Sequence, residues 1–488
     1  MIDLTIHKSI LAKTFVRAKE RDIIIPTFEE QRNPKAIPKK IQQELRELSL
    51  WEIHPRNLFR ITWKNEPTDS GGGFITLPNY IELPSELTGV EARIFALIGK
   101  WMPTGSHKVG ATFGCLVPKL VTGQFDPTKQ VAVWPSTGNY CRGGAYDATL
   151  LACDSLAILP EEMSQERFDW LKTVVGEIIK TPGGESNVKE IFDKCWELKR
   201  ERGDDIVIFN QFDEFGNHLW HHEVTGPAMK DVLDKELGST KFRGTCLTTG
   251  SAGTLGSADY IKKFYPSAKT VAGESLQCPT MLLNGYGYHR IEGIGDKHIP
   301  WIHDVKQTDL VIGIDDKDCI NLMRLFNEES GQKYLKKIGV PNIVVSNLHL
   351  LGISSIANLL MTIKFAKYYE LTRKDTLMTI FTDSMEMYQS RLKEYKEIFG
   401  VYNEIDAKVD YHRSLQGIKT DSMIELRYPE KQRIHHLKYF TWVEQQGKSI
   451  EELNRQWYDE ENYWSSIYNL APKLDELIIE FNNQVGLL

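Results

Sequence analysis

The stretch that decides the fold runs from residue 244 to residue 256, Gly244-Thr245-Cys246-Leu247-Thr248-Thr249-Gly250-Ser251-Ala252-Gly253-Thr254-Leu255-Gly256. Its first half is typical of a buried strand, and residues 257–264 continue with a helical pattern. A glycine-rich turn between a strand and a helix lets the backbone approach a phosphate closely, and Ser251 and Thr254 can add hydroxyl donors. No Gly-Lys-Ser/Thr follows, and the Gly-x-Gly-x-x-Gly spacing is absent, so neither a nucleotide P-loop nor a dinucleotide fingerprint is indicated.

A second turn of the same layout lies upstream. Residues 131–135 predict a buried strand that ends at Ser136-Thr137-Gly138-Asn139, and a helix can begin at Tyr140. Backbone amides at such a turn bind carboxylate or phosphate.

Lys108 ends the segment Pro103-Thr104-Gly105-Ser106-His107-Lys108 and precedes a helix-compatible run at residues 109–112. Small residues surround it, where surface lysines usually sit among charges. A lysine placed there would lie in a low-dielectric pocket, which favours its neutral, nucleophilic amine.

The order of lysine, anion-binding turn and phosphate-binding turn resembles that of the pyridoxal 5'-phosphate (PLP) enzymes of fold type II, the tryptophan-synthase-beta-like group, and the cysteine synthase branch within it. Four further stretches carry the resemblance, which covers roughly residues 75–370: Leu-Pro-Glu-Glu-Met-Ser-Gln-Glu-Arg at 159–167, Asn-Gln-Phe at 210–212 with His-Glu-Val-Thr-Gly-Pro at 222–227, His-Arg-Ile-Glu-Gly-Ile-Gly at 289–295, and Gly-Ile-Ser-Ser at 352–355. It implies an α/β fold of two open lobes with the cofactor in the cleft between them.

The resemblance also implies roles for individual residues. Lys108 would hold the cofactor as an imine and then move the Cα proton. Cofactor contacts would come from Asn139 at the 3-hydroxyl group, from Gly250, Ser251, Ala252, Gly253 and Thr254 at the phosphate, and from Ser354, or Ser355 in its place, at the pyridine nitrogen. Substrate would be bound by Ser136, Thr137 and Gln211, with Tyr140 as a specificity element.

The chain departs from the synthase pattern in ways that leave its exact substrate open. Tyr140 and Cys141 stand where the synthases have Thr-Gly, and Ile356 replaces a glycine. The Thr-Gly-Ser-His-Lys segment is closer to the tryptophan synthase beta subunit. Ala252 also replaces a glycine, and its methyl group is expected to be tolerated only if its backbone angle φ is negative.

The function that the resemblance implies is β-elimination and β-replacement on a serine- or cysteine-type amino acid through an aminoacrylate intermediate, with a small nucleophile as acceptor. One alternative is a lyase that stops after elimination (an ammonia-lyase, desulfhydrase or dehydratase). An alternative of another class is a PLP-binding interaction scaffold without turnover.

Composition narrows the remaining possibilities. The 488 residues carry a net charge of −7 without a basic stripe, so no nucleic-acid partner is expected. We expect no membrane span and no metal site, and the N-terminus lacks the apolar core of a signal peptide, which favours a cytoplasmic protein. The seven cysteines are scattered and predicted to be small buried hydrophobes; Cys141, beside the anion turn, could instead be reactive. The family resemblance implies that the protein is a homodimer.

Three regions are expected: an N-terminal extension at 1–75, a PLP-binding catalytic region at 76–370, and a mostly helical C-terminal extension at 371–488. The N-terminal arm could pack on the catalytic body or on a partner subunit. Predicted strands lie at 131–134, 155–159, 177–180, 206–209, 244–248, 269–273, 310–314 and 343–346. Predicted helices lie at 39–50, 165–173, 188–202, 225–235, 316–328, 355–369, 376–399 and 472–482.

Overall fold

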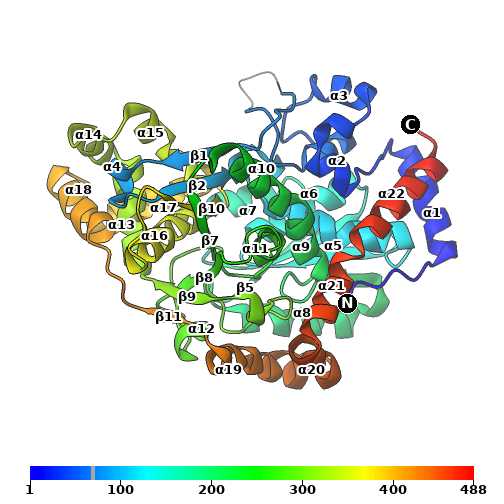
Figure 1. Ribbon diagram of the computed structural model, residues 1–488. Helices are drawn as coiled ribbons and strands as arrows, with labels where there is room; N and C mark the ends of the chain where they lie inside the picture. Colours follow the sequence, from blue (N-terminus) through cyan, green and yellow to red (C-terminus); the bar gives the residue numbers. More distant parts are fainter. Residues whose placement is uncertain (68–71, 488) are drawn as a thin grey trace.

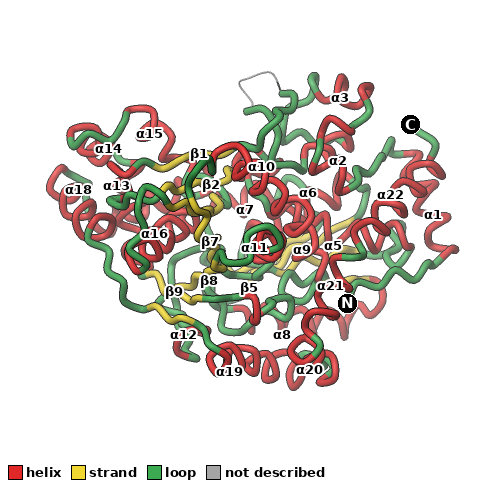
Figure 2. Tube along the Cα trace, in the orientation of Figure 1, coloured by secondary structure: helices red, strands yellow, loops and turns green. Residues whose placement is uncertain are grey.

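The computed structural model describes residues 1–67 and 72–487. Its strands form two sheets with helices on both faces (Figures 1 and 2). The strands are β1 (Tyr80–Leu83), β2 (Arg93–Ile98), β3 (Val131–Pro135), β4 (Asp154–Pro160), β5 (Glu177–Thr181), β6 (Ile206–Ile208), β7 (Lys241–Thr248), β8 (Lys269–Ser275), β9 (Leu310–Ile314), β10 (Asp375–Phe381) and β11 (Met423–Glu425).

The helices of the first half are α1 (Lys8–Glu20), α2 (Phe28–Arg32), α3 (Lys39–Leu45), α4 (Ser85–Thr88), α5 (Lys108–Thr122), α6 (Asn139–Leu150), α7 (Gln165–Leu171), α8 (Val188–Arg202), α9 (Phe215–Trp220), α10 (Gly226–Glu236) and α11 (Leu255–Lys262). Those of the second half are α12 (Thr280–Leu283), α13 (Asp316–Asn327), α14 (Glu329–Lys337), α15 (Asn342–Asn347), α16 (Ile353–Tyr368), α17 (Gln389–Phe399), α18 (Glu404–Asp410), α19 (Tyr428–Lys438), α20 (Ile450–Tyr458), α21 (Glu460–Tyr468) and α22 (Ala471–Val485).

The smaller sheet has the order β5-β4-β3-β6 and is parallel throughout. Side chains along β3 alternate between its two faces, as the pleat requires. Ala132 and Trp134 belong to the core cluster that contains α5 and α6, whereas Val133 packs with Ile191 and Leu198 of α8. Helices therefore cover both faces of this sheet, which is why its strands are apolar on both sides.

The larger sheet has the order β1-β2-β10-β7-β8-β9-β11, with antiparallel pairing only where β1 and β11 join its edges. The core on one face contains α13 and α16, and the core on the other contains α10 and α11. The fold is therefore the predicted α/β fold with two open lobes. In both sheets the turns that follow β3 and β7 lie at the carboxyl ends of the strands, where open parallel sheets bind ligands.

Most predicted elements are present within a few residues, but two are wrong. Residues 343–346, expected as a strand, form part of helix α15, because a short apolar run fits a buried helix as well as a strand. The helix expected at 376–399 is a strand in its first part: β10 lies between β2 and β7, is buried along its whole length, and is followed by helix α17. The division into three regions stays a prediction, and its boundary at residue 370 falls just before a central strand of the larger sheet.

The two ends of the chain pack on the catalytic body and on each other. Figure 1 shows α1 and α22 side by side. The rings of Phe15 and Phe481 are 5.2 Å apart, and the Asn482 amide exchanges two hydrogen bonds with the backbone of Ile25. Trp220 Nε1 of α9 donates to Gln31 Oε1 of the arm at 2.8 Å. Among the described residues, no helix is both long and apolar enough to cross a bilayer.

Candidate active site

Lys108 is the first residue of α5, and its amine lies where the two lobes meet. Its Nζ donates to Gln211 Oε1 at 3.2 Å and to Ser251 Oγ at 3.1 Å. Burial lowers the pKa of Lys108 from 10.5 to about 8, against the opposing effect of the nearby carboxylates Asp296 and Glu185. A substantial fraction of this amine is therefore neutral at mildly alkaline pH.

The turn between β7 and α11, residues 250–254, forms one wall of the site. Ser251 Oγ accepts hydrogen bonds from Lys108 and from Asn217 Nδ2, the latter at 3.0 Å. A side chain at Gly250 would place its Cβ 2.8 Å from Gly293 O, and one at Gly253 would collide with Asn217 Oδ1. Both glycines are thus required by close packing.

Ala252 contradicts the expectation of a negative φ. Its φ is +62°, in the left-handed region that glycine adopts freely and alanine adopts at a cost of about 1–2 kcal/mol. The turn has therefore kept the backbone conformation of a glycine while carrying a methyl group. Because the side chain is buried, the surrounding contacts hold it there.

The turn after β3 forms the opposite wall. Gln211 Nε2 donates to Ser136 Oγ at 3.3 Å, and Ser136 Oγ also accepts from the backbone N–H of Gly138 at 3.2 Å. The Thr137 hydroxyl donates to Glu185. Asn139 opens helix α6 and is buried. Ser136, Gln211, Lys108 and Ser251 form one continuous hydrogen-bonded chain that links the two turns.

A narrow pocket runs between Lys108 and the glycine turn. Its lining consists of His107, Lys108, Leu247, Thr248, Gly250, Ser251, Ala252, Thr254, Gly293, Ile294, Asn358, Ile380 and Thr382. Ser354, the second residue of α16, borders it: a Cβ on Gly293 would be 3.9 Å from Ser354 Oγ. Ser355 Oγ, by contrast, donates to the backbone oxygen of Asp383. The geometry thus favours Ser354 over Ser355 for a contact in the pocket.

Tyr140 does not lie with the other predicted site residues. Its ring is buried in the core cluster, packs edge-on against Trp134 at 5.6 Å, and its hydroxyl contacts Cys115 Sγ at 3.4 Å. The side chain points behind the turn because the first turn of α6 faces α5. We therefore correct its predicted role as a substrate contact to a packing role.

Cys141 is equally inaccessible. Its thiol is fully buried against the backbone oxygen of Trp134, and burial raises its pKa far above the ordinary value. All seven cysteines are buried, as predicted, and a reactive role for Cys141 finds no support.

Several polar residues of this site were not predicted from the sequence. Glu185 is buried and holds Thr137; burial raises its pKa to about 7. Asp296 directly follows the Gly-Ile-Gly at 293–295, and burial together with Glu185 raises its pKa well above the usual value. Only Asp296 had a signal in the sequence, its position beside a quoted motif. Asn217 and Asp383 had none.

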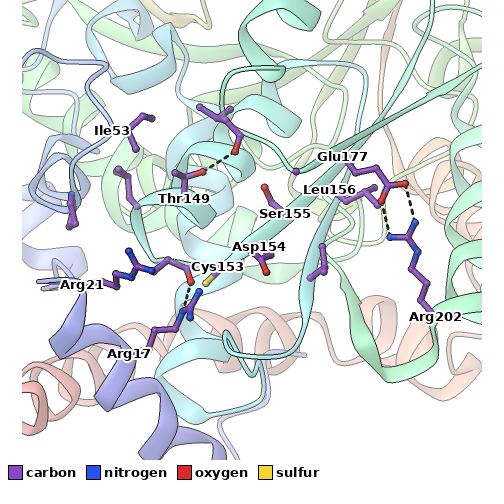
Figure 3. Close-up of a pocket in the computed structure, with 16 residues that line it drawn as sticks. Arg17, Arg21, Ile53, Thr149, Cys153, Asp154, Ser155, Leu156, Glu177 and Arg202 are labelled. Carbon is purple, nitrogen blue, oxygen red and sulfur yellow. Dashed lines mark hydrogen bonds and ion pairs between the residues drawn. The ribbon is translucent and has the colours of Figure 1, made fainter.

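A larger cavity of about 620 Å³ lies elsewhere (Figure 3). It opens at the amino ends of the smaller sheet, beside Val131, Asp154 and Glu177, at the opposite edge from Ser136. Arg202 already donates to Glu177 at 2.9 and 3.0 Å. None of the predicted site residues lines this cavity, so its size does not make it the active site.

Comparisons with known proteins agree with this geometry. A family described as "Pyridoxal-phosphate dependent enzyme" matches residues 79–332. The cysteine synthase of Staphylococcus aureus (strain N315) is 26% identical over 326 residues, which cover 67% of this chain and 96% of the relative. The cystathionine beta-synthase of Saccharomyces cerevisiae is 24% identical over 319 residues, 64% of this chain and 59% of the relative.

Solved structures share the fold. The cysteine synthase of Entamoeba histolytica superposes with a TM-score of 0.57 at 21% identity, covering 70% of this chain and 93% of that one. A hydrogen sulfide-producing enzyme from Fusobacterium nucleatum gives 0.54 at 23% identity, covering 64% and 96%. With the family match spanning more than half of its residues, this chain belongs to the pyridoxal-phosphate-dependent enzymes, and its fold is that of the cysteine-synthase-like members of fold type II.

Proposed function

We propose that this protein catalyses PLP-dependent β-replacement on an amino acid with a leaving group at Cβ, as a cysteine synthase does. The observation that carries the proposal is the Lys108 amine, held by Gln211 and Ser251 at the meeting point of two turns built to receive anions. The relatives named cysteine synthase, matched over nearly their whole length, support this reaction class.

The residues present fit the cofactor. Lys108 would hold it, the turn at 250–254 would bind its phosphate through backbone N–H groups, and Ser354 would face its ring nitrogen. Asn139 Oδ1 is buried and has no hydrogen-bond partner among the described residues. The Asn139 amide donates one N–H to Asp383 and has a second N–H, which could donate to the 3-oxygen of the bound cofactor.

The chain's own residues would then bind substrate and move protons. When bound, the cofactor withdraws electrons from Cα, which makes the Cα proton acidic and lets the group at Cβ leave. Ser136, Thr137 and Gln211 would bind the substrate carboxylate and fix the Cα–H bond toward Lys108. With its pKa lowered to about 8, the Lys108 amine can accept that proton near neutral pH, where an ordinary lysine stays charged.

The second candidate is elimination without replacement, which releases pyruvate and ammonia after water enters. Buried Glu185, near Lys108, supports this second candidate, since with its pKa raised to about 7 it could take a proton from water. We further propose a small amino acid as donor, a small nucleophile as acceptor, a homodimer and a cytoplasmic location. These finer statements rest on the family resemblance.

The test compares the wild-type protein with Lys108→Ala. After PLP is added, wild type should gain visible absorbance and form cysteine from O-acetylserine and sulfide, whereas O-acetylserine alone reports elimination as pyruvate. Lys108→Ala should lose that absorbance and at least about 10³-fold in turnover, because one amine serves both as attachment point and as base. Lys119→Ala, on the same helix and paired with Glu214, is the matched control and should retain both. Full activity in Lys108→Ala would refute the assignment.

A further inference from the structure

A buried carboxylate outside the residues matched by the family contacts the wall of the active site. Asp383 follows β10, the strand between β2 and β7 near the middle of the larger sheet (Figure 1). Two hydrogen bonds fix its backbone oxygen. The backbone N–H of Gly352 donates to Asp383 O at 3.0 Å, and Ser355 Oγ donates to the same oxygen at 3.3 Å. A side chain at Gly352 would collide with the Asp383 carboxylate, so that glycine leaves the space in which the carboxylate lies.

The Asp383 carboxylate bonds across the two lobes. Its Oδ2 accepts from Asn139 Nδ2 at 2.6 Å and from the Tyr388 hydroxyl at 2.7 Å. An ionised carboxylate only accepts hydrogen bonds, so it fixes which way round the Asn139 amide lies, with its nitrogen toward Asp383. Asn139 Oδ1 has no hydrogen-bond partner among the described residues, and neither has Asp383 Oδ1.

A second set of contacts closes the same wall. Arg167 of α7 donates from Nη2 to the Tyr388 hydroxyl at 3.0 Å, and its guanidinium lies 5.2 Å from the centre of the Tyr388 ring. The Arg167 side chain also packs against Gly138, so closely that a Cβ at position 138 would collide with it. Arg167 pairs with Glu292, which in turn pairs with Arg391 at 2.6 Å.

Burial and several neighbouring groups act on the charge of Asp383 in opposite directions. Burial raises the pKa of Asp383, while Arg167, the hydrogen bonds from Asn139 and Tyr388, and Arg142 act in the opposite direction. Charge-assisted hydrogen bonds of this kind are short and directional, and they hold a side chain in one orientation better than neutral ones do.

We propose that Asp383 is a positioning residue: its carboxylate sets the orientation of the Asn139 amide toward the cofactor and, through Tyr388 and Arg167, fixes the turn that receives the substrate. The cofactor contact of Asn139 rests on the proposed function. The positioning itself rests on residues from both lobes and from the segment after residue 370, which the family match does not reach.

A double-mutant cycle on the holoenzyme tests the proposal. Asp383→Asn preserves the shape but removes the charge, and it should weaken PLP affinity about tenfold and shift the absorbance maximum of the bound cofactor. In an Asn139→Ala background, the same substitution should change PLP affinity less than about twofold, because the group through which Asp383 acts is gone. Asp375→Asn, at the start of β10 and paired with Arg243, is the matched control and should leave affinity and absorbance unchanged.

A purely structural role makes the opposite prediction. It lowers the melting temperature of Asp383→Asn without altering the cofactor spectrum, or it lowers PLP affinity equally with and without Asn139; either result overturns the proposal. If Asp383→Asn fails to fold, Tyr388→Phe removes one of the two bonds to the carboxylate and should weaken PLP affinity about threefold, again only when Asn139 is present. A wild-type protein that binds no PLP would defeat the proposed function, whereas wild-type binding with an unaffected Asp383→Asn would defeat only this inference.

Discussion

The two strand-to-helix turns of the active site are alike in layout and different in what holds them. The turn at 250–254 is held by its own backbone, by Lys108 and by Asn217, all within the segment matched by the family. The turn at 136–139 is held by Glu185, by Arg167 and, from beyond that segment, by Asp383. The turn proposed to bind the phosphate therefore depends mainly on its backbone shape, whereas the turn proposed to bind substrate is adjusted by side chains from several places along the chain.

The largest expected effect comes from breaking the first turn with Gly253→Ala. The new methyl group would collide with Asn217, which is buried and donates to Ser251 and to the Gln211 backbone. Such overpacking costs about 2 kcal/mol, which corresponds to about 30-fold weaker PLP affinity. Titration of the apo-protein with PLP, followed by absorbance, measures it.

Gly138→Ala is the matched change in the second turn. Here φ is +152° and the methyl group would collide with the side chain of Arg167, which is buried and held by Tyr388 and Glu292. We expect KM for the amino-acid substrate to rise more than the Kd for PLP. If the two alanine variants altered the same constant, the contrast between the turns would be lost.

A smaller effect should follow from the charge of Glu185, which holds Thr137 and faces Asp296, Lys108 and Arg167. With the pKa of Glu185 raised to about 7 by burial, the group is neutral below that pH and negative above it. A substrate carboxylate bound at Thr137 would then be repelled at higher pH, and KM should rise about fivefold through pH 7, equivalent to about 1 kcal/mol.

Glu185→Gln should abolish that step in KM while the pH dependence set by Lys108 persists. The sign for stability is opposite to that of a salt-bridged acid. Because the folded pKa is raised, the folded state binds the proton more tightly than the unfolded chain, so the free energy of unfolding of wild type relative to Glu185→Gln should fall as pH rises from about 4.5 to 7. A KM profile that is the same in both proteins would show that Glu185 does not face the substrate.

The same contrast explains what the sequence could and could not predict. Lys108 and the turns at Ser136 and Ser251 were predicted from local patterns, because each lies at a strand end or helix start whose signal is contained in a few neighbouring residues. Gln211 was predicted only through the family resemblance, and the roles of these residues stay predictions. The alternation of apolar strands and helices predicted an open α/β architecture, and the family resemblance added the two lobes. The local patterns need no knowledge of distant parts of the chain.

Apart from residues 343–346, whose short apolar run is ambiguous by itself, the failures depend on distant contacts. Tyr140 was expected at the substrate, but the packing of α6 on α5 turns its ring into the core. Residues 376–381 were expected to be helical, but they form a strand because they lie between two other strands of the larger sheet. Asp383 was not predicted as a site residue, because its hydrogen-bond partner, Asn139, lies 244 residues away in the sequence. A single sequence shows neither which strand is central nor which face of a helix is buried.

The smallest effect expected is that of Ala252→Gly. This substitution separates the contribution of the turn's backbone conformation from that of the methyl group at position 252. Glycine would relieve the strain of a left-handed alanine, worth about 1–2 kcal/mol. It would also add about 0.5–1 kcal/mol of backbone entropy to the unfolded chain, so most of the gain cancels. We expect the free energy of unfolding to rise by no more than about 1 kcal/mol, measured by thermal or urea denaturation, and PLP affinity to stay unchanged. A change in PLP affinity as large as that of Gly253→Ala would mean that the methyl group itself shapes the phosphate site; an unchanged affinity would show that the backbone conformation alone does, with residue 252 free to vary as long as φ stays positive.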